Sequence, residues 1–193
     1  MMGVFTMIRV GLALVLAAAL SLGADAAAGR ARGVQKWIDA HREVLRDASR
    51  ATGVPSSVLA AICLWEGGWK LKQTNWCGQT VPARPAPAPC PPGSWRSGSA
   101  IRPGPCMRMF DSFPSAVFAL GKNLCTHPGY AAGRRVMSAA GGDIKAFDHA
   151  RFFRVIGAVY SIPGWERGTL SVLRDHRLKE LDTDEELVSC VGT

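Results

Sequence analysis

A proline-rich segment in the middle of the chain sets the strongest limit on its fold. Eight of the twelve prolines in the 193 residues lie between Val81 and Pro105. Proline lacks the backbone donor that a helix interior needs, so regular helix is excluded from this stretch. Cys77, Cys90 and Cys106 bracket and interrupt it. This arrangement favours a lobe held by disulfides over a free linker.

Helical patterns lie on both sides of the proline-rich segment. Apolar residues there recur at the i, i+3, i+4 spacing of amphipathic helices, and glycine or proline ends each run. Strands and helices do not alternate, so a parallel α/β sheet is disfavoured and a mainly α fold is expected. The expected helices are Val34 to Ala48 (ended by Gly53), Pro55 to Glu66, one capped by Asp111-Ser112 and broken at His127, a short segment from Tyr130 to Met137, one capped by Asp143 and reaching Val159, and a last one from about Trp165 to Leu181.

The first 26 residues have the pattern of an export signal. Met1 to Arg9 ends in a positive charge, Val10 to Leu20 is an apolar run of eleven residues, and Ala24-Asp25-Ala26 offers a small-x-small cleavage site. The run is shorter than the roughly 20 residues of a membrane-spanning helix. The sequence therefore predicts a signal peptide over residues 1–26 and a single domain over residues 27–193. The expected protein is periplasmic or secreted, with no stable membrane insertion after cleavage.

Charge and cysteine content narrow the possible partners. The net charge of +8 favours an anionic partner, or serves only solubility, and export argues against nucleic acid. Six cysteines in an exported chain predict disulfides, whose pairing the sequence leaves open. Neither C-x-x-C nor H-E-x-x-H occurs, so no metal and no cofactor are expected. The oligomeric state is left open as well.

Glu66 is the residue that most suggests chemistry. It ends an apolar helix between Trp65 and Trp69, and no other Asp or Glu occurs from position 67 to 110. Apolar surroundings and the negative end of the helix dipole both favour the protonated carboxyl group. A general acid for glycosidic cleavage needs such a group near neutral pH. The alternative is a solvent-facing glutamate, or one paired with Lys70.

Five short motifs follow one another between Ala51 and Leu181. They are Ala51-Thr52-Gly53-Val54-Pro55 leading to Glu66-Gly67-Gly68-Trp69, then Asn75-Trp76-Cys77-Gly78, Arg108-Met109-Phe110-Asp111-Ser112-Phe113, His127-Pro128-Gly129-Tyr130, and Tyr160-Ser161-Ile162-Pro163-Gly164-Trp165. In this order they resemble glycoside hydrolase family 73, the bacterial endo-β-N-acetylglucosaminidases. Gly67 replaces the usual Ser of the family, and Phe110 replaces Tyr.

The resemblance implies a fold and a set of site residues. It implies a lysozyme-like α-helical domain, a small β-containing, disulfide-stapled lobe over about residues 75–107, and a glycan-binding cleft between them. It also implies Glu66 as the general acid and Tyr160 as the cleft tyrosine. The candidate substrate-binding residues are Asn75, Trp76 and Trp95, with core packing as the alternative for both tryptophans. Trp69 and Trp165 are expected to pack in the core.

The second catalytic group is missing from the expected place. Most glycosidases use two carboxylates, but the stretch from Lys70 to Phe110 contains none. Asp111 suits helix capping better than catalysis. Either the N-acetyl group of the substrate assists, which is the preferred hypothesis, or the protein is weakly active or inactive. A Cys63 nucleophile is disfavoured for lack of a partner histidine; a buried thiol or a disulfide to the Cys125 helix is expected instead.

These observations predict an exported peptidoglycan hydrolase of the endo-β-N-acetylglucosaminidase type. Its expected partner is the glycan strand of peptidoglycan, cleaved at β-1,4 bonds after N-acetylglucosamine. One alternative is a lytic transglycosylase, although no Gly-Leu-Met-Gln segment of that type occurs. The other is a catalytically inactive wall-binding or assembly protein on the same scaffold.

Overall fold

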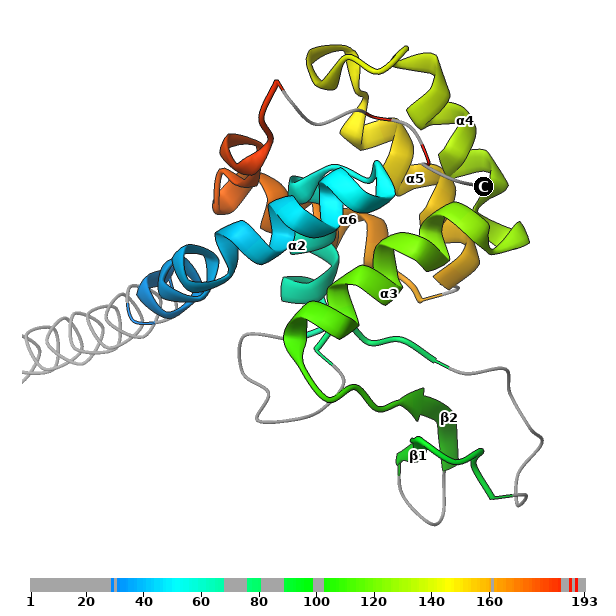
Figure 1. Cartoon of the computed structure of the whole chain (residues 1–193). Helices are drawn as coiled ribbons and strands as arrows, with labels where there is room; N and C mark the ends of the chain where they lie inside the picture. Colours follow the sequence, from blue (N-terminus) through cyan, green and yellow to red (C-terminus); the bar gives the residue numbers. More distant parts are fainter. Residues whose placement is uncertain are drawn as a thin grey trace, which may run out of the picture.

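Helices form the main body of the protein, and a small two-stranded lobe projects from one side of it (Figure 1). The computed structural model describes residues 29, 31–67, 76–80, 89–98, 103–160, 162–184, 188 and 190. The predicted signal peptide over residues 1–26 lies outside the described residues. Within them, no helix is both long enough and apolar enough to cross a membrane.

A buried helix, α2 (Ser56–Trp65), forms the centre of the core. Nine of its ten residues are buried, and a helix that is apolar on all sides belongs to a protein interior. The helix before it covers residues 31–52 and ends where Gly53 takes a φ of 74°. Both predicted helices are therefore confirmed, with Pro55 as the residue just before α2.

The helices after the lobe pack around α2. They are α3 (Phe113–Thr126), η1 (Pro128–Tyr130), α4 (Ala131–Ala139), η2 (Ile144–Ala146), α5 (His149–Tyr160), α6 (Trp165–Asp175) and η3 (Leu178–Leu181). α3, α6 and η3 contact α2 directly, while α5 packs against α4 and α6. The predicted mainly α fold is confirmed.

Three predicted boundaries differ in detail. Ser112 alone caps α3, accepting the N–H of Ser115 at 3.3 Å. Asp143 caps only the short η2, and Asp148 accepts the N–H of Arg151 at 2.9 Å at the start of α5, so two elements replace one predicted helix. The last predicted helix divides because Arg177 takes a φ of 51°, a left-handed conformation that ends α6 before η3.

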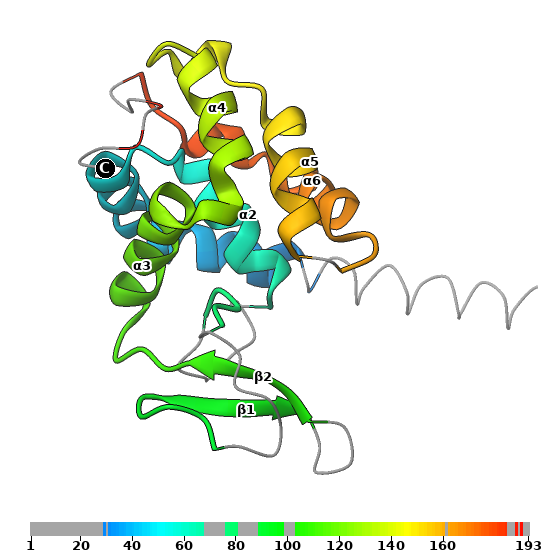
Figure 2. The same cartoon turned by 90° about the vertical axis from the view of Figure 1, so that its right-hand side faces the viewer.

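The lobe contains one antiparallel pair of strands, β1 (Ser94–Gly98) and β2 (Pro103–Arg108), which Figure 2 shows side by side. Trp95 lies opposite Met107, and the pairing is irregular between Arg96 and Gly98. Both strands lie at sheet edges, where proline can be tolerated without loss of a ladder hydrogen bond. The Cys90–Cys106 disulfide fastens the hairpin to the preceding segment. A β-containing, disulfide-stapled lobe is thus confirmed.

All six cysteines form disulfides: Cys63–Cys77, Cys90–Cys106 and Cys125–Cys190. The expected link between Cys63 and the Cys125 helix is wrong, as is the free thiol. Cys63 instead joins α2 to the first segment of the lobe, and Cys125 joins α3 to the C-terminal segment. The Cys63–Cys77 bond follows from the approach of the lobe to the end of α2, a tertiary contact that residue spacing does not encode.

Candidate active site

Glu66 lies where the buried helix α2 ends. Its N–H donates to the carbonyl of Ile62 at 3.0 Å, so it closes the last turn, and Gly67 then takes a φ of 84° and turns the chain away. The end of α2 that carries Glu66 points toward the lobe (Figure 2). The buried helix α2 thus places Glu66, the acid at its end, at the junction between the helical body and the lobe.

Two contacts enclose the Glu66 carboxyl group. From α6, the indole N–H of Trp165 donates to Glu66 Oε1 at 3.0 Å, and Trp165 is itself only 1 % exposed. On the lobe side, a Cβ added to Gly78 would lie 2.5 Å from Glu66 Oε2. The lobe backbone therefore packs directly against the carboxyl group, which is possible only because residue 78 is glycine.

The environment of Glu66 favours its protonated form. Burial raises the pKa of Glu66 above its ordinary value, because removal from water penalises the charge. The hydrogen bond from Trp165 lowers the pKa of the same group, but its effect is smaller than that of burial. A half-buried carboxyl group with a raised pKa and one fixed donor suits a general acid.

Two tyrosines extend this site. The ring of Tyr160 stacks on Trp165 with centroids 4.1 Å apart, and its hydroxyl donates to Tyr130. Burial raises the pKa of both hydroxyls, and the nearby Glu66 charge adds to the increase. Both tyrosines therefore stay neutral. The single O–H of Tyr160 is used in its bond to Tyr130, so the hydroxyl of Tyr130 is the donor that remains beside Glu66. Tyr130 is absent from the predicted site residues, although its motif, His127-Pro128-Gly129-Tyr130, is visible in the sequence.

The other predicted site residues are less closely associated with Glu66. Trp76 is half-buried against the core, with its ring edge-on to Phe113 at 6.4 Å, as expected for packing. Trp95 belongs to β1, in the hairpin of the lobe. Asn75 and Trp69 lie outside the described residues. Trp165 is buried as predicted, but its bond to Glu66 gives it a contact that a core assignment does not anticipate.

No other carboxylate of the described residues is among the groups that shift the pKa of Glu66. Glu166 follows Trp165 in sequence, but its Oε1 lies 3.6 Å from Arg154 Nε, in an exposed pair. Asp111 is exposed beside the cap of α3. Neither acid is among the causes that shift the pKa of Glu66.

Solved structures share the arrangement of these helices and the lobe. A crystal structure of a peptidoglycan hydrolase from Sphingomonas sp. A1 matches with a TM-score of 0.54 and 19% identity, covering 76% of this chain and 92% of that one. The chain has the fold of a peptidoglycan hydrolase. A glutamate-to-alanine mutant of the same Sphingomonas protein matches with the same TM-score and identity, covering 76% of this chain and 94% of that one. The catalytic domain of an autolysin from Listeria monocytogenes matches with a TM-score of 0.54 and 13% identity, covering 78% of this chain and 88% of that one.

The structural matches bear out the predicted fold, a helical domain with a small lobe, as the fold of peptidoglycan hydrolases. No family model matches the sequence, and no curated protein matches it. The low identities mean that the shared property is the arrangement of helices and lobe. The roles of individual residues depend on the geometry around Glu66.

A serine, a histidine and an aspartate also meet in the core, at the other end of α2. Ser57 Oγ and Asp182 Oδ2 lie 2.8 and 3.3 Å from the same nitrogen, Nε2 of His149. A catalytic triad needs the acid on the other ring nitrogen, so this cluster does not activate the serine. Asp182 instead accepts the N–H of Ser57 at 2.8 Å and caps α2, whose own N-cap residue, Pro55, makes no side-chain cap bond.

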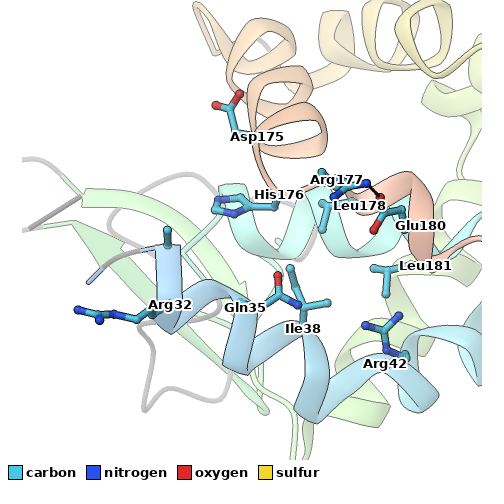
Figure 3. Close-up of a pocket in the computed structure, with 11 residues that line it drawn as sticks. Arg32, Gln35, Ile38, Arg42, Asp175, His176, Arg177, Leu178, Glu180 and Leu181 are labelled. Atoms are coloured by element: carbon cyan, nitrogen blue, oxygen red, sulfur yellow. Dashed lines mark ion pairs between the residues drawn. The ribbon is translucent and has the colours of Figure 1, made fainter. Parts of the chain in front are cut away.

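A cavity of about 410 Å³ lies between the first helix and the end of α6 (Figure 3). Its apolar wall includes Ile38, Leu178 and Leu181. Two of the charges around it are paired locally: Arg177 with Glu180, as Figure 3 shows, and Asp175 with Arg174 outside the lining. No group of three metal-ligating side chains occurs anywhere in the described ranges. Glu66 does not line this cavity, so we place the candidate site at the lobe junction.

Trp165→Phe tests the donor to Glu66. Phenylalanine lacks the indole N–H, the one contact that lowers the pKa of Glu66, so that pKa is expected to rise further. The alkaline limb of kcat/KM should then move to higher pH. A pH–rate profile measures the shift; a limb at the wild-type position would contradict the role of the indole. Tyr160→Phe keeps the ring that stacks on Trp165 and serves as the control.

The Cys63–Cys77 disulfide is expected to hold the lobe against Glu66. It spans 14 residues, and Cys90–Cys106 spans 16, so removing either costs a similar free energy of unfolding, about 3 kcal/mol. Only the first joins α2 to the segment that contains Gly78. Cys63→Ala with Cys77→Ala should therefore lower kcat strongly, while Cys90→Ala with Cys106→Ala should largely retain it. Equal losses of activity in the two double variants, measured with matched denaturation curves, would refute this assignment.

Proposed function

We propose that the protein is an exported peptidoglycan hydrolase that cleaves the β-1,4 bond after N-acetylglucosamine, with Glu66 as the general acid. The observation that carries this proposal is the Glu66 carboxyl group at the end of α2, enclosed by Trp165 and Gly78, with a raised pKa. The fold supports it, since the matched structures are described as peptidoglycan hydrolases and an autolysin.

The chemistry follows from the protonation state of Glu66. The neutral carboxyl group donates its proton to the glycosidic oxygen as the bond to the anomeric carbon breaks. The indole N–H of Trp165 then stabilises the carboxylate that remains. The neutral hydroxyl of Tyr130, which accepts the O–H of Tyr160, can donate its own proton to a substrate oxygen beside the reacting bond. The acetamido group of the substrate supplies the stabilisation at the anomeric carbon, for which the described residues offer no second carboxylate.

Charge and disulfides fit a cell-wall substrate. The net charge of +8 suits the anionic surface of the wall, and three disulfides suit a periplasmic or extracellular location, where oxidation can form them. The disulfides support export, and the signal-like segment over residues 1–26 is its sequence basis.

A second candidate, lytic transglycosylase activity, is favoured by the same single acid. An enzyme that closes an anhydro ring on N-acetylmuramic acid needs no water-activating carboxylate. Both candidates use Glu66 in the first step, and they differ in the bond that they cleave and in the fate of the sugar.

Product analysis tests the proposal. Purified peptidoglycan is digested with the mature protein, and the new ends are identified by mass spectrometry. Reducing N-acetylglucosamine ends are expected, and anhydromuramic ends would replace the proposal with the transglycosylase. Absence of cleavage, with retained sedimentation on sacculi, would instead identify a wall-binding protein on this scaffold. Glu66→Gln is the matched control in each digestion.

A further inference from the structure

Trp65, the residue before Glu66, is unusually exposed. It is 39 % exposed, whereas the nine other residues of α2 are buried. Leaving a large indole in contact with water forgoes the hydrophobic stabilisation that burial would give. An exposed aromatic side chain beside a candidate catalytic acid is therefore a candidate for ligand contact.

The ring of Trp65 lies against Gly168 on α6. A Cβ added at Gly168 would lie 2.0 Å from Cη2 and 2.1 Å from Cζ3 of Trp65. The absence of a side chain at position 168 is thus what allows the indole to lie close to the α6 backbone. That contact supports one side of the ring, while the ring remains partly open to solvent.

The contacts of Trp65 and Glu66 lie next to each other on α6. Glu66 bonds Trp165, and Trp65 contacts Gly168, three residues later. Residues i and i+3 are neighbours on one helix face, with a rise of about 4.5 Å between them. The Trp65 ring and the Glu66 carboxyl group therefore contact neighbouring positions on the same face of α6.

We propose that Trp65 is a sugar-binding platform on which a pyranose ring next to the scissile bond stacks. The inference rests on the proposed function and adds a subsite to it. A β-1,4-linked N-acetylhexosamine presents a flat face of C–H groups, and the rigid indole offers a matching apolar surface at low conformational cost. Gly168 is a positioning residue, because it sets where the ring lies.

Binding to a defined oligosaccharide tests the platform independently of cleavage. The Glu66→Gln protein is titrated with the β-1,4-linked tetramer of N-acetylglucosamine, and isothermal calorimetry gives Kd. In this background Trp65→Ala should weaken binding about 10-fold, and Trp65→Tyr should restore much of it. The control is Phe118→Ala, which removes an exposed aromatic residue of a different helix, α3, and should leave Kd unchanged.

Gly168→Ala provides a second variant that keeps the indole. The added methyl group must displace the ring, so binding should weaken, while the alanine favours the α6 helix. Gly157→Ala is the matched control, because a Cβ at position 157 meets its nearest atoms at an ordinary 3.5 Å. Combining Gly168→Ala with Trp65→Ala should add little to Trp65→Ala alone, since both act on one contact.

The outcomes separate this inference from the proposed function. If the active protein cleaves peptidoglycan but Trp65→Ala changes neither KM nor Kd, the platform is wrong and the hydrolase assignment stands. If no cleavage occurs but Trp65→Ala still weakens glycan binding, the platform stands and the enzymatic assignment fails. Equal losses of binding in Trp65→Ala and Phe118→Ala would overturn the platform.

Discussion

Replacing Glu66 with glutamine is expected to lower kcat by about 10²- to 10⁴-fold, the usual contribution of a general acid. Glutamine keeps the shape of the side chain and can still accept the N–H of Trp165, but it has no proton to transfer. KM should change little, because the substrate contacts remain. Release of soluble fragments from purified peptidoglycan measures the loss, and near-wild-type turnover would exclude Glu66 as the acid.

The same substitution lowers activity but is expected to raise stability near neutral pH. The pKa of Glu66 in the folded protein lies above its ordinary value of 4.5, so as pH rises the unfolded chain releases this proton first. The free energy of unfolding therefore falls as pH rises through the window between the two pKa values, and it stays lower above it. Glu66→Gln should melt at a higher temperature than the wild type near neutral pH. Below pH 4.5 the difference should shrink.

Gly78→Ala is expected to have the second-largest effect on activity. The new methyl group would lie 2.5 Å from Glu66 Oε2, and 2.7 Å from Cγ and Cδ, so the carboxyl group or the lobe must move. Position 78 also has a φ of 64°, which alanine adopts only with strain. Since a misplacement of 1 Å can cost about 100-fold in rate, kcat should fall by at least that factor.

Gly93→Ala separates the clash at Gly78 from the backbone strain. Gly93 lies in the same lobe with a φ of 73°, but a Cβ there would meet nothing within 4 Å. Each glycine variant should lose about 1–2 kcal/mol of unfolding free energy from strain alone. Only Gly78→Ala should lose activity as well. Comparable kcat values for the two variants would show that the approach of Gly78 to Glu66 does not matter for catalysis.

The sequence predicts most of the helices because their signals are local. Amphipathic spacing and a terminal glycine locate the first two helices, and prolines exclude helix from the lobe. The predicted helix boundaries are wrong where two residues can each cap a helix, as with Asp143 and Asp148. They are also wrong where a non-glycine residue takes a left-handed conformation, as Arg177 does. Such choices depend on tertiary packing rather than on local propensity.

The sequence points to the centre of the candidate site, Glu66, but not to most of the residues that surround it. Glu66 stands out because it is the single acid in an apolar context, and Tyr160 because of its motif. Trp165 and Gly78 reach Glu66 from positions 99 residues after it and 12 residues after it, so no local pattern joins them. Trp65 shows the same limit, because its exposure depends on where α6 passes the end of α2. The disulfide pairing also depends on contacts between distant residues, so the sequence does not predict it.

The Cys63–Cys77 disulfide also makes the candidate site dependent on where the chain is oxidised. Cys63 precedes Glu66 by one helical turn, and Cys77 directly precedes Gly78, so the bond closes beside the acid. A chain without this bond lacks the link that holds the Gly78 segment against Glu66, so we expect its carboxyl group to be more open to water. Disulfides form in oxidising compartments outside the cytosol. Under the proposed function, the acid of the enzyme becomes competent only in the compartment that holds its substrate.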